Sequence, residues 1–395
     1  MRRCGLARGR ALIACAATAV VFAGCTTQAT STVTVSGKNL TIYLAAPPNA
    51  RLDARAQDVL DAEQLAFGLQ HSSVPDFTLR LKVLHGAKVS DNARTVIQDD
   101  TAIAYLGDII PGDSADSLGI LNYEDVLQVS PTDTAVELTQ PSAAVPGSPD
   151  LYYESLSTFG RTFARVVPTT ALEARALLAE LVSEHVSHVY LTTDGQPYGA
   201  ALAAALRHTA GAAVTVTSGR PVAATAASSG AQAVLFATAS PSAAQSLFNR
   251  VAAVNSSLKL FAASALDDTG FVAGLSPQAA AALRVSSPGF TSAALNGPGQ
   301  GFVTAFTSAY GHAPSTQAIF GYEAMSAVLS VLKEAGKGAN NRSTVQRDFF
   351  AIHNRDSVLG TYSINANGDT SVAPFVISRV RLGRLVPFRF VSEQG

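Results

Sequence analysis

The sequence predicts an α/β fold with two doubly wound, Rossmann-like lobes lying side by side. Short apolar runs alternate with amphipathic stretches along most of the chain, a pattern typical of parallel β–α–β units. The chain has 395 residues, which is too many for one ordinary hydrophobic core. The residues after 285 contain too few strand patterns for a third sheet, so we expect them to complete the first two lobes.

The N-terminal segment predicts an export signal outside the fold. Arginine residues precede an apolar run over 11–23, which suits a signal peptide and is shorter than the roughly 20 residues that span a bilayer. The small residues before Cys25 resemble a bacterial lipobox, in which the cysteine becomes the lipidated N-terminus; Phe22 departs from the usual leucine. We expect a signal peptide over 1–24 and a lipid anchor on Cys25. A plain secretory signal with an incidental cysteine is the alternative.

Cysteine content and charge exclude several classes of protein. Once the signal is removed, Cys25 alone remains, so the chain has no internal disulfide, Cys₄ zinc site or Cys–x–x–Cys redox pair. Removal of four arginines leaves 24 basic residues against 29 acidic ones, a net charge of about −5. Nucleic acid is not an expected partner, because phosphate binding needs a concentrated basic surface. No later segment is apolar for 18 residues, so no transmembrane helix is expected.

The first lobe is expected to follow a Ser/Thr-rich tether over 25–39. Its elements follow the periodicity of apolar residues, which is two in half-buried strands and 3.6 in amphipathic helices. We predict strands at 40–45, 79–83, 102–107 and 126–130, and helices at 54–70 and from an N-cap at Ser90.

The second set of elements begins after a loop with two prolines at 142–149. We predict strands at 161–168, 188–192, 213–217, 233–237 and 258–262, and helices at 171–185 and 200–210. Ser240-Pro241 and Ser276-Pro277 each predict an N-cap followed by proline at the first helical position.

The C-terminal part predicts two helices and a hairpin. A helix over 317–335 is closed by Gly336, and a second over 343–353 begins with a capping box of Ser343 and Gln346. Strands at 360–364 and 373–380 are expected to form a hairpin across Asn367-Gly368.

Four segments give the chain a family resemblance. They are DAEQ at 61–64, LG at 106–107 followed by VSPTDTAVELTQ at 129–140, TTDGQPYGAALAAAL at 192–206, and FGYEAMSAVLSVLKEAG…LGTYSINANGDT within 320–370. In this order and spacing the chain resembles type 1 periplasmic binding proteins of the leucine/isoleucine/valine-binding kind, the receptors of ABC importers. The resemblance implies a periplasmic binding protein-like I fold with three crossover segments, near 163–168, 283–290 and 354–360. It implies that lobe 1 comprises 40–160 and 285–356, and that lobe 2 comprises 161–284 and 357–395.

The resemblance also implies a ligand site between the lobes, at the carboxyl ends of the parallel strands. The family binds a ligand carboxylate with the loop that corresponds to SPTDT, which points to Thr132 and Thr134. Free N–H groups and hydroxyls after a strand suit an anion on physical grounds, although an ordinary helix cap is the alternative. Tyr198 matches an aromatic residue that contacts the ligand; packing at the lobe boundary is its alternative.

The sequence departs from the family pattern at three places. Pro111 stands where the family has a serine, so Asp113 or Ser114 is expected to substitute. Ser264 stands where an acid pairs with the ligand ammonium, unless Asp267 or Asp268 reaches the cleft. The first βα loop is AAPPNARLDA instead of a Ser/Gly-rich turn. Because a buried ammonium without a carboxylate is costly, a branched-chain amino acid is not the expected ligand.

No catalytic or metal centre is expected. The seven histidines are scattered, and neither a nucleophile elbow nor a phosphate-binding loop is present. The resemblance implies an extracytoplasmic, membrane-anchored lipoprotein that captures a small polar solute (amino-acid-like, an amide or a carboxylate) for an ABC importer, without a cofactor. Its expected partners are the solute and either ABC permease subunits or a membrane sensor. The alternative is a ligand-sensing or protein-interaction lipoprotein that reuses the fold without transport.

Overall fold

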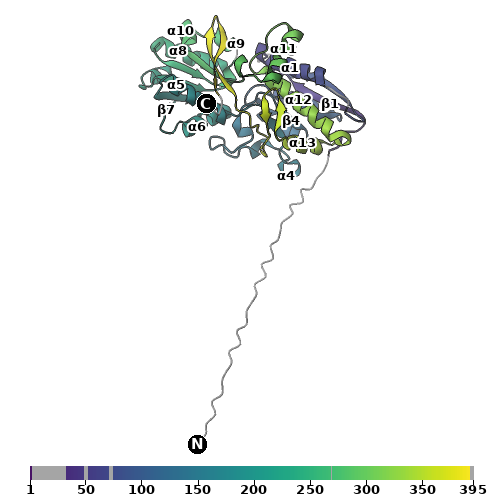
Figure 1. Cartoon of the computed structure of the whole chain (residues 1–395). Helices are drawn as coiled ribbons and strands as arrows, with labels where there is room; N and C mark the ends of the chain where they lie inside the picture. The colour runs from purple at the N-terminus through teal and green to yellow at the C-terminus, as the bar shows by residue number, and fades with distance from the viewer. Residues whose placement is uncertain (2–32, 49–51, 71–73, 268, 392–395) are drawn as a thin grey trace.

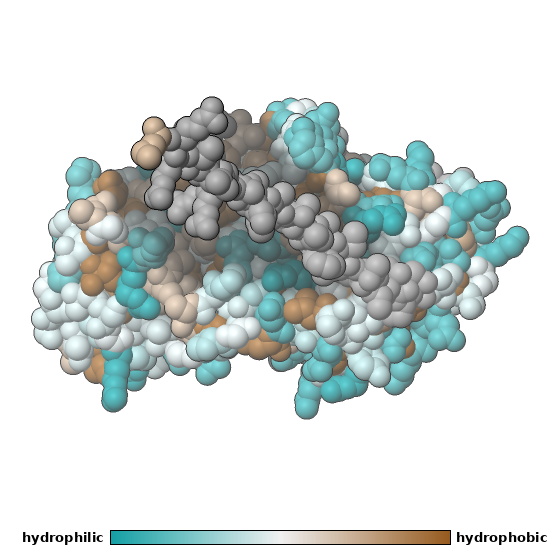
Figure 2. All heavy atoms as spheres, turned by 90° about the horizontal axis from the view of Figure 1, so that it is seen from below, coloured by the Kyte–Doolittle hydropathy of each residue, from teal (hydrophilic) through white to brown (hydrophobic). Residues whose placement is uncertain are grey.

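The computed structural model describes residues 1, 33–48, 52–70, 74–267 and 269–391, which form two lobes side by side (Figure 1). The predicted signal, Cys25, most of the predicted tether and Asp268 lie outside these residues. Each lobe has a sheet with helices on both faces, so the predicted α/β class with two doubly wound lobes is confirmed. On the face seen in Figure 2, hydrophobic residues are scattered among hydrophilic ones.

The first lobe contains a parallel sheet with the strand order β2-β1-β3-β4-β5. Its strands are β1 (Asn39–Ala45), β2 (Thr78–Leu84), β3 (Ala102–Leu106), β4 (Leu127–Ser130) and β5 (Phe163–Arg165). Its helices are α1 (Ala54–Gln70), α2 (Val89–Ile97), α3 (Leu118–Tyr123), α11 (Gly297–Tyr310), α12 (Ala318–Ala335) and α13 (Arg342–Phe350), with the short α4 (Leu156–Phe159) before β5. α1, α11, α12 and α13 share one apolar core, and α2 and α3 cover the other face. β1 and β3 are therefore buried on both sides, which explains why β3 is apolar throughout and β1 is apolar from Ile42 to Ala45.

The second lobe contains a sheet of seven strands with the order β14-β13-β10-β9-β8-β6-β7. These are β6 (His188–Thr193), β7 (Thr215–Gly219), β8 (Ala233–Ala237), β9 (Lys259–Ala262), β10 (Leu283–Pro288), β13 (Phe375–Arg381) and β14 (Arg384–Val391). β6 to β10 pair in parallel, whereas β13 and β14 are antiparallel additions at the edge. α5 (Thr170–Ser183) and α6 (Pro197–Ala210) cover one face; α7 (Ala223–Ala227), α8 (Pro241–Val254), α9 (Thr269–Ala273) and α10 (Pro277–Ala282) cover the other.

The chain passes from one sheet to the other after β5, after β10 and before β13. β5 pairs with β4 in the first sheet, and β10 pairs with β9 in the second. The crossovers expected near 163–168 and 283–290 thus each begin with a strand that extends the sheet the chain is leaving. This arrangement places the loops after β4 and before α11 between the lobes.

The predicted C-terminal turn at Asn367-Gly368 forms, with one antiparallel bridge between Ile364 and Thr370, but the predicted pairing of strands 360–364 and 373–380 is wrong. β12 (Gly360–Tyr362) pairs with β11 (Arg355–Ser357), and β13 pairs with β10 and β14. The turn at Asn367-Gly368 instead packs on the first sheet, where the Gly368 carbonyl accepts a hydrogen bond from the Arg165 amide at 2.8 Å. A side chain at Gly368 would meet the Phe163 carbonyl at 2.3 Å, so glycine is required for this close approach.

Two predicted helix caps are confirmed and two are wrong. The hydroxyls of Ser240 and Ser276 accept the amides of Ala243 and Ala279 at the starts of α8 and α10. α2 begins at Val89, before Ser90. α13 is capped by Asn341, because the Ser343 hydroxyl donates to the Asp125 carboxylate instead.

Candidate functional site

The loop after β4 lies where the two lobes meet, but its threonines are already engaged. Thr132 is fully buried, and its hydroxyl donates to the Ile109 carbonyl within the first lobe at 2.5 Å. The Thr134 hydroxyl lies 3.4 Å from the Ser264 hydroxyl of the second lobe. Thr134 therefore contacts the opposite lobe directly, while Thr132 faces its own lobe.

Asp133, between these threonines, supplies an anion to the loop. Its carboxylate accepts the amide hydrogens of Gly112 at 2.7 Å, Ser114 at 3.0 Å and Ala135 at 3.0 Å. Burial raises the pKa of Asp133, an effect that the Arg165 charge and these amides oppose. Three amides beside the predicted threonines are thus held by a carboxylate of the chain.

The two residues expected to replace the missing serine lie beside Asp133. Ser114 is fully buried, and its hydroxyl accepts the Asp108 amide at 3.3 Å. Asp113 begins the 3₁₀ turn Asp113–Asp116 and is half-buried. Ser114 and Asp133 therefore belong to one hydrogen-bonded network within the first lobe.

Tyr198 is buried at the start of α6 and meets a carboxylate that sequence reasoning did not single out. Its hydroxyl lies 3.4 Å from the Ser264 hydroxyl and 3.5 Å from Glu173 Oε2. Glu173 also accepts the Ser264 amide at 2.6 Å and the Ser286 hydroxyl at 2.5 Å. Burial raises the pKa of Glu173, and hydrogen bonds from Ser286 and Ser264 offset part of this effect.

The lobes touch along this part of their boundary. A Cβ atom at Gly112 in the first lobe would lie 3.5 Å from Cβ of Tyr198 in the second. Apolar side chains extend the contact as one buried cluster that includes Leu118, Ala135 and Leu138 with Leu177, Tyr198 and Leu202. Protein contacts thus occupy the place where Thr132, Thr134, Ser114 and Tyr198 were expected to hold a ligand.

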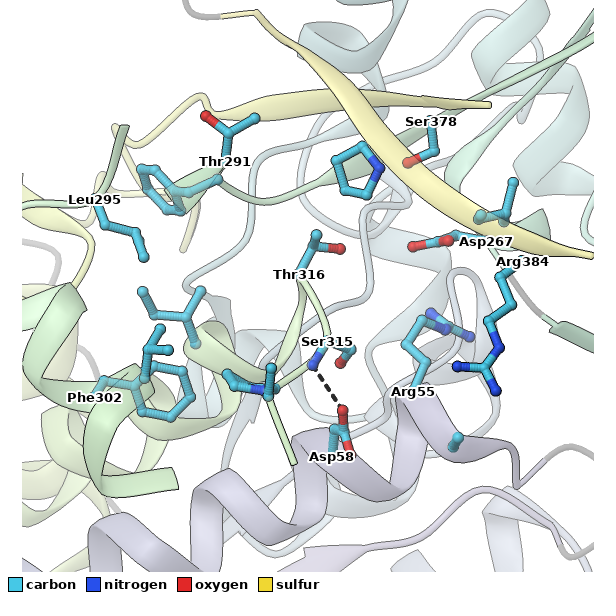
Figure 3. Close-up of a pocket in the computed structure, with 18 residues that line it drawn as sticks. Arg55, Asp58, Asp267, Thr291, Leu295, Phe302, Ser315, Thr316, Ser378 and Arg384 are labelled. Carbon is cyan, nitrogen blue, oxygen red and sulfur yellow. Dashed lines mark hydrogen bonds between the residues drawn. The ribbon is translucent and has the colours of Figure 1, made fainter. Parts of the chain in front are cut away.

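An open cavity of about 590 Å³ lies elsewhere between the lobes (Figure 3). It is formed by the start of α1, the segment from β10 into α11, the loop before α12, Asp267, and the β13–β14 hairpin. Its lining residues are Ala54, Arg55, Asp58, Asp267, Phe290, Thr291, Leu295, Phe302, Val303, Ala313, Pro314, Ser315, Thr316, Ile319, Ser378, Arg384, Leu385 and Pro387. Its volume lies within the roughly 300–1,000 Å³ typical of small-molecule sites.

One end of the cavity is charged. Arg55, Asp267 and Arg384 lie together there, from the first lobe, the second lobe and the C-terminal hairpin (Figure 3). The Asp267 carboxylate accepts the Ser287 hydroxyl at 2.6 Å and the Gln317 amide at 3.1 Å. Burial raises its pKa, while the positive charge of Arg55 opposes the rise. Of the predicted ligand residues, Asp267 is the one that lines this cavity.

Arg55 is held in place by polar neighbours from its own lobe, one of which also contacts the second lobe. Its Nη1 donates to Gln317 Oε1 at 2.9 Å, and Gln317 in turn donates to Asp267. Its Nε has no hydrogen-bond partner among the described residues and lies 3.7 Å from Asp53 Oδ2. Arg384, by contrast, is exposed, and no described residue forms an ion pair with it.

The other end of the cavity is apolar. Phe302, Leu295 and Thr291 lie there, away from the arginines (Figure 3). The Phe290 ring stacks with Phe390 at a centroid distance of 6.0 Å and lies 6.3 Å from Phe320. The cavity is therefore bipolar: it has charged groups at one end and aromatic and aliphatic walls at the other.

Asp58 fixes one side of the cavity. Its carboxylate accepts the Ser315 amide at 2.7 Å, which ties the loop before α12 to α1 (Figure 3). His312 lies 3.8 Å from the other oxygen. Burial raises the pKa of Asp58. Because the Asp58 carboxylate is engaged by the loop before α12, Asp58 holds that wall of the cavity in position.

Arg55, Asp133, Glu173 and Arg384 were missed by sequence reasoning. The role of Asp133 could have been predicted, because an aspartate after a strand readily accepts hydrogen bonds from nearby backbone amides. Arg55 and Arg384 lie at opposite ends of the sequence, so no local pattern could have paired them.

The described residues add no sign of metal chemistry or of a membrane span. No group of three or more His, Cys, Asp or Glu side chains lies close enough together to hold a metal ion within that part of the chain. None of its helices has the length and apolarity needed to cross a bilayer.

Comparison with known proteins identifies the fold. The model of a family described as periplasmic binding protein matches residues 86–384. No curated protein matches the sequence. A leucine-binding protein LivK from Thermotoga maritima is 16% identical, with a TM-score of 0.73, and the match covers 90% of this chain and 99% of that one. The branched-chain amino acid binding protein LivJ from Streptococcus pneumoniae, in complex with isoleucine, is 15% identical, with a TM-score of 0.69 and coverage of 90% and 100%. A solute-binding protein of an ABC transporter from R. palustris, in complex with benzoate, is 16% identical, with a TM-score of 0.67 and coverage of 90% and 97%.

Proposed function

Because the chain belongs to the periplasmic binding protein family, we propose that it captures a small polar solute between its lobes for an ABC importer. The observation that carries this proposal is the cavity of about 590 Å³ whose walls come from both lobes. A solute there contacts Arg55 from one lobe and Asp267 from the other, so it stabilises the closed arrangement more than an open one. Such differential contact is the physical requirement for a receptor that closes on its ligand.

The ligands of similarly folded proteins support the solute class. Solved structures with this fold hold isoleucine, leucine or benzoate, each a small molecule with a carboxylate and an apolar body. The bipolar cavity has one end suited to each of these parts. We extend the proposal to an amino-acid-like compound, an amide or a carboxylate.

The proposal includes a location outside the cytoplasm and a lipid anchor. The N-terminal sequence supports both, since a signal peptide over 1–24 would leave Cys25 as the acylated residue. Lipid chains on Cys25 would hold the lobes close to the permease subunits that receive the solute.

A second function is favoured by the closed boundary around Tyr198. The buried cluster that includes Leu138 and Leu202 joins the lobes through direct protein contacts. A protein whose lobes are already joined is suited to a sensing or protein-interaction role on the membrane, without transport.

Thermal unfolding against a panel of solutes tests the proposal. The full chain, expressed with its own leader and purified in mild detergent, is melted with amino acids, amides, carboxylates and sugars. A solute at 100 times its dissociation constant adds about 2.7 kcal/mol of stability, which appears as a rise of several degrees in Tm. An unchanged Tm across the whole panel would contradict solute capture and favour the interaction role.

A further inference from the structure

We infer that the cavity takes a small organic anion, with its carboxylate at Arg55 and Arg384 and its apolar body between Phe290 and Phe302. The inference rests on the proposed function and names the solute class. It also fixes the orientation of the solute, with the anionic group away from the apolar end of the cavity.

The charged end offers an anion more unused partners than it offers a cation. Arg384 is exposed at the cavity and forms no ion pair with any described residue. Arg55 is more than nine-tenths buried, and its Nε lacks a hydrogen-bond partner in the described part of the chain. A carboxylate between the two guanidinium groups would give both a charge-assisted hydrogen bond.

The carboxylates of the cavity are already engaged. Asp267 accepts hydrogen bonds from Ser287 and Gln317 and lies in the field of Arg55. Asp58 accepts the Ser315 amide. An incoming ammonium group would compete with these contacts, whereas an incoming carboxylate would meet Arg384, which has no ion pair with a described residue, and the Arg55 Nε, which donates no hydrogen bond among those residues.

The apolar end selects the rest of the molecule. Phe302 is almost fully buried, and Phe290 and Leu295 are half-buried with surface left facing the cavity. Covering that surface contributes about 25 cal/mol for each Å² removed from water. A branched aliphatic chain or an aromatic ring fits this wall, whereas a sugar would leave its hydroxyl groups without partners.

The opposite orientation is unfavourable for an anion. It would place the carboxylate beside Phe302, Leu295 and Thr291, at the end of the cavity whose lining residues carry no charge (Figure 3). A carboxylate removed from water there would have no cationic partner. The anionic group of a solute is therefore left with the arginine end.

Ligands of the same shape but different charge test whether the solute must carry a carboxylate. Binding of 4-methylpentanoate, 4-methylpentanamide and leucine to the full chain is measured by titration calorimetry; benzoate and benzamide form a second pair. The three aliphatic compounds share one carbon skeleton and differ only in their polar groups: a carboxylate, a neutral amide, or a carboxylate with an ammonium group. We expect at least one carboxylate to bind, its amide to bind at least tenfold more weakly, and leucine to bind more weakly than 4-methylpentanoate.

Arginine variants locate the anion. Arg384→Gln is expected to weaken carboxylate binding about tenfold and to leave amide binding unchanged. Arg381→Gln is the matched control, because Arg381 is exposed on the same hairpin and is not a lining residue. Melting curves without ligand verify that both variants are folded.

The results that would contradict the anion inference differ from those that would contradict the proposed function. Equal binding of acid and amide, tighter binding of leucine, or an Arg384→Gln variant with full affinity would each overturn the anion inference and leave solute capture standing. If none of the five compounds binds while another solute of the broad panel does, the anion inference fails alone. If nothing in either set binds, the proposed function fails with it.

Discussion

The Asp133 carboxylate accepts the Gly112 amide hydrogen at 2.7 Å, and this contact joins the loop after β4 to the loop after β3. Two further amides converge on the same carboxylate. The chain thereby holds an anion of its own at a place where backbone N–H groups would otherwise attract one from solution.

Replacing Asp133 by alanine is expected to expose this anion site. Three amides, two of them buried, lose their acceptor, so we expect the variant to lose about 2 to 3 kcal/mol of unfolding free energy. Formate fits the vacated volume and should restore part of the loss in a concentration-dependent manner, as measured by denaturant unfolding. Asp116→Ala is the control, because Asp116 is exposed in the same segment. A variant that formate does not stabilise more than the parent protein would contradict the prediction.

Asp369→Ala is expected to leave the buried guanidinium group of Arg165 without its carboxylate partner. Arg165 Nε lies 3.0 Å from Asp369 Oδ1, and the two side chains are 0% and 5% exposed. Removing one partner of a buried ion pair costs about 3 to 5 kcal/mol, because the other charge stays desolvated. Chemical denaturation of Asp369→Ala should show a loss of this size.

A double variant distinguishes the charge from the packing. Arg165→Met combined with Asp369→Leu removes both charges and should recover at least half of the loss. Asp356→Ala, at an exposed position, should change little. Equal stability of the single and double variants would indicate that packing, not the unpaired charge, dominates.

Glu63 is expected to make the protein less stable as pH rises. It is almost fully buried in α1, and neither carboxylate oxygen has a hydrogen-bond partner among the described residues. Burial raises the pKa of Glu63 well above its value in an unfolded chain. With respect to this group, the free energy of unfolding is therefore highest below pH 4.5, and it falls as pH rises toward the pKa of Glu63 in the folded protein.

Replacing Glu63 by methionine should remove this loss. Methionine has a similar length and needs no hydrogen bond, so we expect the variant to gain about 1 to 3 kcal/mol at pH 8 and little at pH 4. Unfolding curves at the two pH values measure the difference. Glu334→Met, at an exposed site on α12, is the control. A gain at pH 4 as large as that at pH 8 would rule out titration of Glu63 as the cause.

Glu184 is expected to act in the opposite direction. Lys259 lies 3.0 Å and Arg284 3.1 Å from its carboxylate, and Arg379 contacts it as well. These cations lower the pKa of Glu184 to about 2 against the opposing effect of burial. The stability they provide is present above pH 4.5 and is lost as pH falls toward 2.

Glu184→Gln should reduce the loss of stability that occurs as pH falls below 4.5. At pH 7 we expect a loss of about 2 kcal/mol, the usual contribution of hydrogen bonds to a charged group. Thermal unfolding between pH 7 and pH 3 should show the parent and the variant converging. If the two curves stay parallel over that range, Glu184 does not titrate as proposed.

Much of the fold followed from local sequence. Strands such as Ala102–Leu106 and Ala233–Ala237 are buried apolar runs, and Ser240 and Ser276 cap helices where a proline follows them. The C-terminal hairpin failed because Asn367-Gly368 is a good turn sequence, and local sequence cannot show that Gly368 is needed against Phe163. Long-range packing decided which strand paired with which.

The candidate site was less predictable. The loop that contains Thr132 and Thr134 lies between the lobes as expected, but hydrogen bonding to Asp133 depends on a neighbouring loop. Arg55 and Arg384 meet only because the last hairpin joins the edge of the second sheet. A charge pair of that kind has no signature in either segment taken alone.

The β13–β14 hairpin also provides a way to read occupancy optically. Leu382 at its tip is fully exposed, two residues from Arg384. A Leu382→Cys variant would carry an environment-sensitive dye, and an acylated Cys25 would not compete for the label. Fluorescence from that one position would turn the protein into a reporter of its own cargo.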